Sequence, residues 1–286
     1  GDHAGALADW DRALELDPGL AIAWSNRGAV FMALGRVLEA IESYDRALAI
    51  DPGFAEAWLN RGLACENRGD LDRALADYEQ AIACREAFAA AWTGRARIRL
   101  RRRELDAARA DLDRALEIEP DHVHALENRG WVRLESGDAA GAVPDFRRAV
   151  EVGGERASVL AGLGRAQLES GDAAGAARSL DRALELEPAL AEAWTLRARA
   201  RRAQGDRRGA IGDLERALEV DPANDATRLE RARYLVEAGE LDAAERAYAD
   251  LLERRPDWGA AHLARSLLDL ARGDRQRALA DCALAI

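Results

Sequence analysis

Apolar residues recur along the whole chain at spacings of three and four positions, the period of an α-helix with one buried face. They form pairs of amphipathic segments on either side of a short turn that usually contains glycine. The segment AWSNRG at 23–28 returns as AWLNRG at 57–62 and as ALENRG at 125–130, so the step is 34 residues or a multiple of it. The pattern predicts an all-α protein built from tandem helix pairs.

A frame in which Trp24 holds position four fits the chain without any insertion or deletion. It predicts a single array over residues 1–286, with a half repeat at 1–20 and a truncated repeat at 259–286. The predicted full repeats are 21–54, 55–88, 89–122, 123–156, 157–190, 191–224 and 225–258.

Four columns of this frame are nearly uniform. Position twenty is always Ala, position eight is always small, position fifteen is Gly except at Arg103, and position thirty-two is mostly Pro. Glycine at fifteen suits a left-handed residue that ends the first helix, and proline stops the second helix. The small residues allow two helices to approach closely, while large residues at positions four and twenty-four fill the space between neighbouring pairs.

With these columns the chain resembles the tetratricopeptide repeat family over its whole length. Repeat 21–54 matches the family pattern with Trp24, Gly28, Phe31, Ala40, Tyr44, Ala47 and Pro52. The resemblance implies a right-handed α-solenoid, a superhelix of antiparallel helix pairs whose first helices line a concave groove. Members of the family bind peptides or extended protein segments in that groove and rarely perform chemistry themselves.

The resemblance also implies that positions two, five, six, nine, twelve and thirteen of each first helix face the groove. Trp131 at position nine is either a partly exposed anchor for a partner or a residue that packs over a neighbouring helix, and both interpretations stay open. The residues expected to contact a partner are Asn26, Leu59, Asn60, Leu63, Arg97, Arg101, His124, Glu127, Asn128, Trp131, Arg165, Arg199, Arg202 and Arg233.

Two charged columns carry structural hypotheses. Position seven is Arg in seven of eight copies and position twenty-three is Asp in six of nine, which predicts an Arg–Asp pair between the helices of most repeats. The repeat with Leu163 at position seven has Ser179 at twenty-three. At position eleven, where the family prefers an aromatic residue, this chain has Arg99, Arg133 and Arg201. We expect their heads to reach water along the helix seam, in preference to a polar stripe for a ligand.

Composition narrows the function further. The formal net charge of −11 argues against general affinity for nucleic acid or anionic lipid, and no apolar run approaches the roughly 20 residues of a membrane span. All basic residues are Arg, which indicates the coding bias of a GC-rich, bacterial genome. The three Cys show no CxxC spacing, and His122 with His124 lacks further ligands, so we expect neither metal nor cofactor.

No GxGxxG, GxxxxGK[ST], GxSxG or HExxH motif occurs. We therefore expect a non-enzymatic scaffold that binds a protein or peptide. Two alternatives stay open: a substrate-recruiting arm of a larger enzyme or secretion machine, and end-to-end self-association through uncapped terminal repeats. Residue 1 is Gly and falls mid-repeat, so we expect an excised segment. The compartment stays undetermined, with the cytoplasm as the default.

Overall fold

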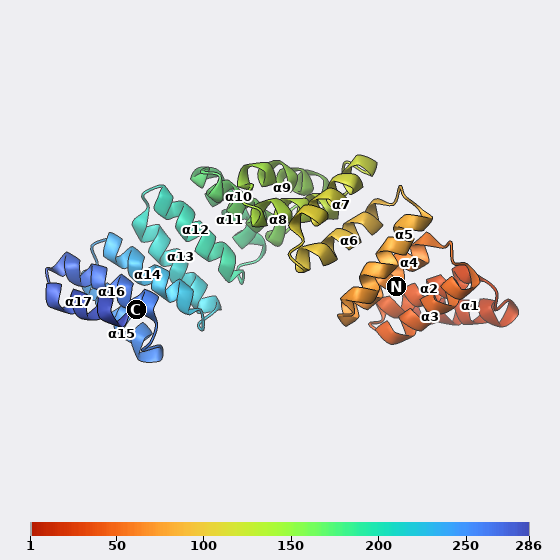
Figure 1. Ribbon diagram of the computed structural model, residues 1–286, viewed down its shortest axis with the longest axis horizontal. Helices are drawn as coiled ribbons and strands as arrows, with labels where there is room; N and C mark the ends of the chain where they lie inside the picture. The colour runs from red at the N-terminus through yellow and green to blue at the C-terminus, as the bar shows by residue number, and fades with distance from the viewer. Residues whose placement is uncertain (1, 286) are drawn as a thin grey trace. The chain divides into compact units, whose positions relative to one another are not determined.

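The computed structural model describes residues 2–285, in which all regular secondary structure is α-helical. The chain forms two compact units, Gly1–Gly153 and Gly154–Ile286. Figure 1 shows the helices of each unit following one another in antiparallel pairs. The predicted all-α solenoid class is confirmed.

The helices of the first unit are α1 (His3–Leu16), α2 (Ala21–Ala33), α3 (Val37–Ile50), α4 (Ala55–Arg68), α5 (Leu71–Cys84), α6 (Ala89–Arg101), α7 (Leu105–Ile118), α8 (Val123–Glu135) and α9 (Ala139–Gly153). Those of the second unit are α10 (Ala157–Glu169), α11 (Ala173–Leu186), α12 (Ala191–Ala203), α13 (Arg207–Val220), α14 (Asp225–Glu237), α15 (Leu241–Arg254), α16 (Gly259–Arg272) and α17 (Arg275–Leu284).

The even-numbered helices α2 to α16 are the first helices of the predicted repeats. Each of these even-numbered helices begins at position one of the repeat frame. Within the units, most successive first helices contact one another: α2 with α4, α4 with α6, α6 with α8, α10 with α12, and α14 with α16. One side of each unit is therefore made of first helices. The boundary between the units follows Gly153, inside the predicted repeat 123–156 and at a junction without proline. The single array over 1–286 stays a prediction.

The turn between paired helices follows the expected chemistry. Glycines at position fifteen adopt positive φ, for example 86° at Gly69, and Arg103 takes the same left-handed conformation with φ 63°. An acidic residue then caps several of the second helices, as where the Asp70 carboxylate accepts a hydrogen bond from the backbone N–H of Arg73. The carboxylate also lies at the positive end of the helix, which favours its charge.

Close approach of the helices depends on the small residue at position eight. The buried ring of Tyr78 lies against Gly62 of its own repeat and Gly94 of the next. A Cβ at Gly62 would come to 2.8 Å from that ring, and one at Gly94 to 2.7 Å. These glycines are therefore required by packing and not by backbone conformation.

The same packing relation at Gly130 gives a testable prediction. Its Cβ would lie 2.8 Å from the Phe146 ring, so we expect Gly130→Ala to lower the free energy of unfolding by about 1–3 kcal/mol. Chemical denaturation followed by circular dichroism measures this change. Repeat 89–122 has Ala96 with Leu112 at the same two positions. Combining Gly130→Ala with Phe146→Leu should thus cost less than the sum of the single changes, and strict additivity would contradict the packing argument.

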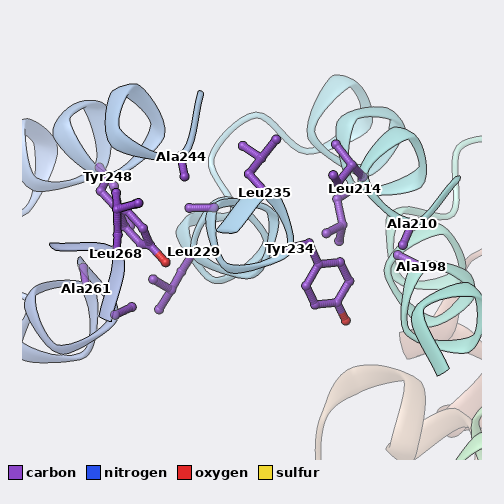
Figure 2. Close-up of a cluster of buried hydrophobic side chains, with 14 of the residues drawn as sticks. Ala198, Ala210, Leu214, Leu229, Tyr234, Leu235, Ala244, Tyr248, Ala261 and Leu268 are labelled. Atoms are coloured by element: carbon purple, nitrogen blue, oxygen red, sulfur yellow. The ribbon is translucent and has the colours of Figure 1, made fainter. Parts of the chain in front are cut away.

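Consecutive pairs share one apolar core. Figure 2 shows this for the second unit, where Leu214 of α13, Leu229 and Leu235 of α14, Tyr248 of α15 and Leu268 of α16 belong to one cluster. A single pair could not bury these faces alone. The shared core holds the first helices side by side, and so fixes the surface that they present.

Candidate functional site

Many charged side chains of the described residues form ion pairs that join one helix to another. In five repeats of the described part, the arginine at position seven donates two hydrogen bonds to the aspartate at position twenty-three, with N–O distances of 2.6–3.0 Å. The predicted Arg–Asp pairing is confirmed in these repeats, which contain Arg61–Asp77, Arg95–Asp111, Arg129–Asp145, Arg197–Asp213 and Arg265–Asp281.

The same arginines also join neighbouring repeats. Arg61 reaches back to Asp45 at 2.6 Å, and Arg129 reaches back to Asp113 at 2.8 Å. These acids occupy position twenty-five of the preceding repeat, on its second helix. The guanidinium therefore lies between two carboxylates, one from each repeat, and links the pairs.

The position-eleven arginines keep 22–32% of their side-chain surface exposed, but their heads bind a buried acid and do not simply reach water as expected. Arg99, Arg133 and Arg201 each donate a hydrogen bond of 2.8 Å to the buried aspartate at position twenty-three of their own repeat. An unpaired buried carboxylate is costly, and a second cation stabilises it. In repeat 157–190, which has no charge at positions seven, eleven and twenty-three, Gln167 at position eleven accepts a hydrogen bond of 2.7 Å from Ser179.

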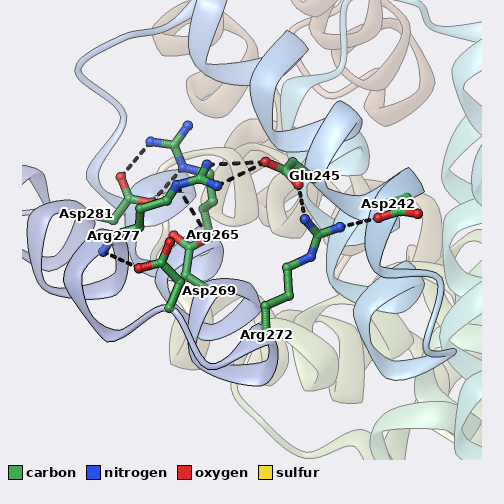
Figure 3. A network of polar contacts seen from close by, with 8 residues as sticks. Asp242, Glu245, Arg265, Asp269, Arg272, Arg277 and Asp281 are labelled. Carbon is green, nitrogen blue, oxygen red and sulfur yellow. Dashed lines mark hydrogen bonds and ion pairs between the residues drawn. The ribbon is translucent and has the colours of Figure 1, made fainter.

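A further network ties α15 to the helices that follow it (Figure 3). The Glu245 carboxylate binds Arg272 of α16 and Arg277 of α17, and Arg272 also binds Asp242. Burial raises the pKa of Asp269, which lies 3.9 Å from the Arg277 guanidinium. These contacts hold adjacent helix pairs in register.

The first helices of the second unit line two adjoining hollows. One of about 510 Å³ lies between α10, α12 and α14 and includes Arg165, Glu192, Thr195 and Arg199 in its wall. The other, of about 520 Å³, lies between α12 and α14 and includes Arg199, Arg202 and Arg233. The structure thus brings together four of the arginines expected to face a groove.

Three of these four arginines are compensated by glutamates. Arg199 donates two hydrogen bonds of 2.8 Å to Glu230, and Arg202 donates two of 2.6–2.7 Å to Glu237. Arg165 binds Glu169 within its own helix at 2.8 Å. Burial opposes the charge of Glu230, but hydrogen bonds from Arg199 and Tyr234 hold its pKa below the usual value. The wall is therefore charged yet locally balanced.

In the first unit, Arg97 and Arg101 converge on a buried acid that the sequence analysis did not single out. Glu66 binds the guanidinium of Arg97, lies 3.1 Å from that of Arg101, and accepts a hydrogen bond of 2.9 Å from the Tyr78 hydroxyl. Burial opposes the charge of Glu66, but the bonds from Arg97 keep its pKa low. Arg97 is therefore engaged within the fold, and its position at a groove surface does not make it a free cation.

Trp131 has features of both a packing residue and a partly exposed anchor, the two interpretations that the sequence left open. Its ring packs edge-on against Phe146, with centroids 5.2 Å apart, as a packing residue would. It also lines a hollow of about 370 Å³ with Leu100, Arg101 and Leu105, as an anchor would. The indole is partly exposed and held in place, which is a suitable state for contact with a partner.

The other predicted residues lie on α2, α4 and α8. Asn26, Asn60 and Asn128 are partly exposed, and Leu59 with Leu63 packs against the core of the first unit. The last two of the predicted set are His124, which is exposed, and Glu127, whose carboxylate lies 3.7 Å from the His124 ring.

Among residues 2–285, no cluster of His, Cys, Asp and Glu has the arrangement needed to hold a metal ion. No helix of this described part has the length and apolar character needed to cross a membrane.

The fold and this surface define a helical-repeat scaffold for protein interaction. Three family models described as tetratricopeptide repeat match the chain, at residues 21–54 and 55–87, at 93–159, and at 133–200 and 201–268. The chain belongs to the tetratricopeptide repeat family, as the columns predicted, and members of this family are generally non-catalytic. A search of curated proteins finds no match.

Solved structures share the fold. PilF of Pseudomonas aeruginosa is 19% identical with a TM-score of 0.64, over 71% of this chain and 93% of that one. YrrB, described as a TPR protein with an unusual peptide-binding site, is 20% identical with a TM-score of 0.58, over 65% and 96%. The Cut9–Hcn1 hetero-tetramer of APC/C is 18% identical with a TM-score of 0.65, over 79% and 45%. At these identities the similarity shows the fold alone.

Proposed function

We propose that the chain binds an extended protein segment along the face made by its first helices, and that the two hollows of the second unit are the centre of this site. The observation that carries the proposal is the convergence of Arg165, Arg199, Arg202 and Arg233 on these hollows. The resemblance to the tetratricopeptide repeat family implied that these positions face a partner.

The walls suit a peptide better than a small charged ligand. Their arginines are mostly held by glutamates, so each Arg–Glu pair presents fixed N–H donors beside fixed acceptors. A peptide backbone carries both kinds of partner at every residue. The hollows also continue along adjacent helices, which an extended segment can follow. YrrB, a TPR protein of the same fold with an unusual peptide-binding site, supports peptide binding by analogy.

Filling the hollow between α10, α12 and α14 tests this proposal. Short random peptides displayed on phage are selected on the full chain, and their affinities are measured by fluorescence anisotropy. Thr195 lines the hollow and is partly exposed, so Thr195→Trp should block it without disturbing the core. We expect the variant to weaken the selected peptides by about tenfold or more, because a bulky ring excludes the segment from its site.

The matched control is Arg246→Trp, which places the same ring on the exposed surface of the second helix α15. It should leave binding unchanged. Failure to select any peptide, or equal affinity for the Thr195→Trp variant and the unchanged chain, would refute the proposed site. If this chain is the recruiting arm of a larger enzyme or secretion machine, the same face of the chain binds the recruited protein.

A further inference from the structure

The second unit has a third hollow, and its character differs from that of the other two. It measures about 220 Å³, lies between α14 and α16, and is walled mainly by Val236, Tyr248, Ala264 and Leu267. The Tyr248 ring belongs to the core shown in Figure 2, so the floor of the hollow is fixed by packing. The hollow is therefore an apolar depression on a rigid base.

Exposed leucines continue this apolar surface along α16. Leu263, Leu267 and Leu270 are 52%, 60% and 53% exposed, and they occupy positions five, nine and twelve of the repeat. These are the groove positions that carry Thr195, Arg199 and Arg202 in α12. The face that is polar at α12 thus becomes apolar at α16, and contiguous exposed apolar surface of this kind marks sites of interaction.

Arg233 stands where the polar and apolar parts meet. It lines both the 520 Å³ hollow and the apolar one. Its side chain is exposed and makes no hydrogen bond or ion pair with any residue of the described part, unlike Arg199 and Arg202. Glu237, the acid that lines the same two hollows, is already held by Arg202. The charge left without a partner at the edge of the apolar hollow is therefore positive.

We infer that this end of the groove selects a protein segment in which an acidic side chain lies close to a leucine-sized apolar side chain. The apolar group enters the hollow between α14 and α16, and the carboxylate binds Arg233. In an extended segment the two groups should lie within about three residues of each other, because each residue advances the chain by about 3.3 Å. This inference rests on the proposed function and specifies the chemistry of its partner.

The physical case combines two contributions. Leu267 and its neighbours gain from removal from water, and the small hollow limits which side chain can enter. The Arg233–carboxylate pair contributes less, because it lies near water, but it sets the direction and register of the segment. Binding should therefore depend on both groups and should weaken as salt rises.

The test uses the peptides selected on the unchanged full chain. We expect enrichment of Asp or Glu near Leu, Ile, Met or Phe. Arg233→Glu should weaken such peptides by about tenfold, since an attraction becomes a repulsion. A peptide whose acidic residue is replaced by Lys should bind the Arg233→Glu variant with restored affinity. The same peptide should bind the unchanged chain weakly. Leu267→Ser should weaken binding of the acidic peptide to the unchanged chain and of the Lys peptide to the Arg233→Glu variant. Arg246→Glu on α15 serves as the charge-matched control.

The outcomes separate the two proposals. Peptides that lose affinity for Thr195→Trp but bind Arg233→Glu and Leu267→Ser normally would leave the proposed function standing and overturn this inference. Selected peptides without an acidic residue, or without rescue by the charge exchange, would overturn it as well. If no peptide is selected, both proposals fail. Circular dichroism of each variant verifies the fold, and the exposure of Arg233 and Leu267 makes unfolding an unexpected result.

Discussion

Replacing Asp145 with serine is expected to lower the free energy of unfolding by about 3 kcal/mol, since two arginines lose the buried carboxylate that holds them. Arg129 donates two hydrogen bonds to this carboxylate and Arg133 donates one. Both guanidinium groups are partly exposed, which places the effect at the lower end of the range for buried pairs. Urea denaturation measures the change, and hydrogen exchange in α8 and α9 locates it.

The chain supplies its own control for this experiment. Repeat 157–190 has Leu163, Gln167 and Ser179 at the three positions, with a neutral hydrogen bond in place of the ion pairs. Introducing Arg129→Leu and Arg133→Gln together with Asp145→Ser should restore most of the lost stability, because no buried charge is then left unbalanced. Asp113 also loses Arg129, but its side chain is 46% exposed, so this loss costs little. A triple variant no more stable than Asp145→Ser alone would show that charge balance is not the reason for the loss.

Tyr78→Ala should have a comparable or larger effect, lowering the free energy of unfolding by about 4 kcal/mol. The side chain is fully buried, its ring fills the space between Gly62 and Gly94, and its hydroxyl donates to Glu66. Truncation leaves a cavity that the two glycines cannot fill. Chemical denaturation measures the loss.

Tyr78→Phe separates the ring from the hydroxyl. It keeps the packing and removes one hydrogen bond to Glu66, which still binds Arg97, so the expected cost is about 1 kcal/mol. If phenylalanine proved as damaging as alanine, the hydroxyl–carboxylate bond and not the ring would be the dominant contribution.

The sequence predicted the fold well because each repeat column reports a local requirement. Glycine at position fifteen accepts positive φ, and small residues at position eight make room for the ring at position twenty-four. Such requirements depend on a few neighbouring residues and recur along the chain. A single sequence therefore shows the same requirement several times, which makes it recognisable. The Arg–Asp pairs were predictable for the same reason.

The position-eleven arginines were misjudged because that column was considered alone. Arg99 and Arg133 occur in repeats with Asp at position twenty-three, whereas Gln167 occurs with Ser179. Comparing the two columns would have indicated a bond between them. The pattern is incomplete, since Asp77 is accompanied by Cys65, and this weakened the signal.

The candidate site was harder to predict, because its contacts cross between repeats. Glu66 and Arg97 are 31 residues apart, and only the stacking of α4 on α6 shows that they meet. Knowing that a charged residue lies at a groove position does not show whether another residue of the fold already binds its charge. Arg199 and Arg202 are held by glutamates of the following first helix, and Arg233 is not. That distinction requires coordinates.

The reach of Arg129 to Asp113, and of Arg61 to Asp45, has a consequence for how such a gene can change. The two linking groups stand in the same columns of most repeats, so deleting repeat 55–88 would bring Arg95 opposite Asp45 and keep the link. Repeats 123–156 and 157–190 are an exception, because Arg147 holds the acid's position and Leu163 holds the arginine's. Most modules can therefore be exchanged without loss of this link, whereas separating these two neighbours would place Arg147 opposite another arginine.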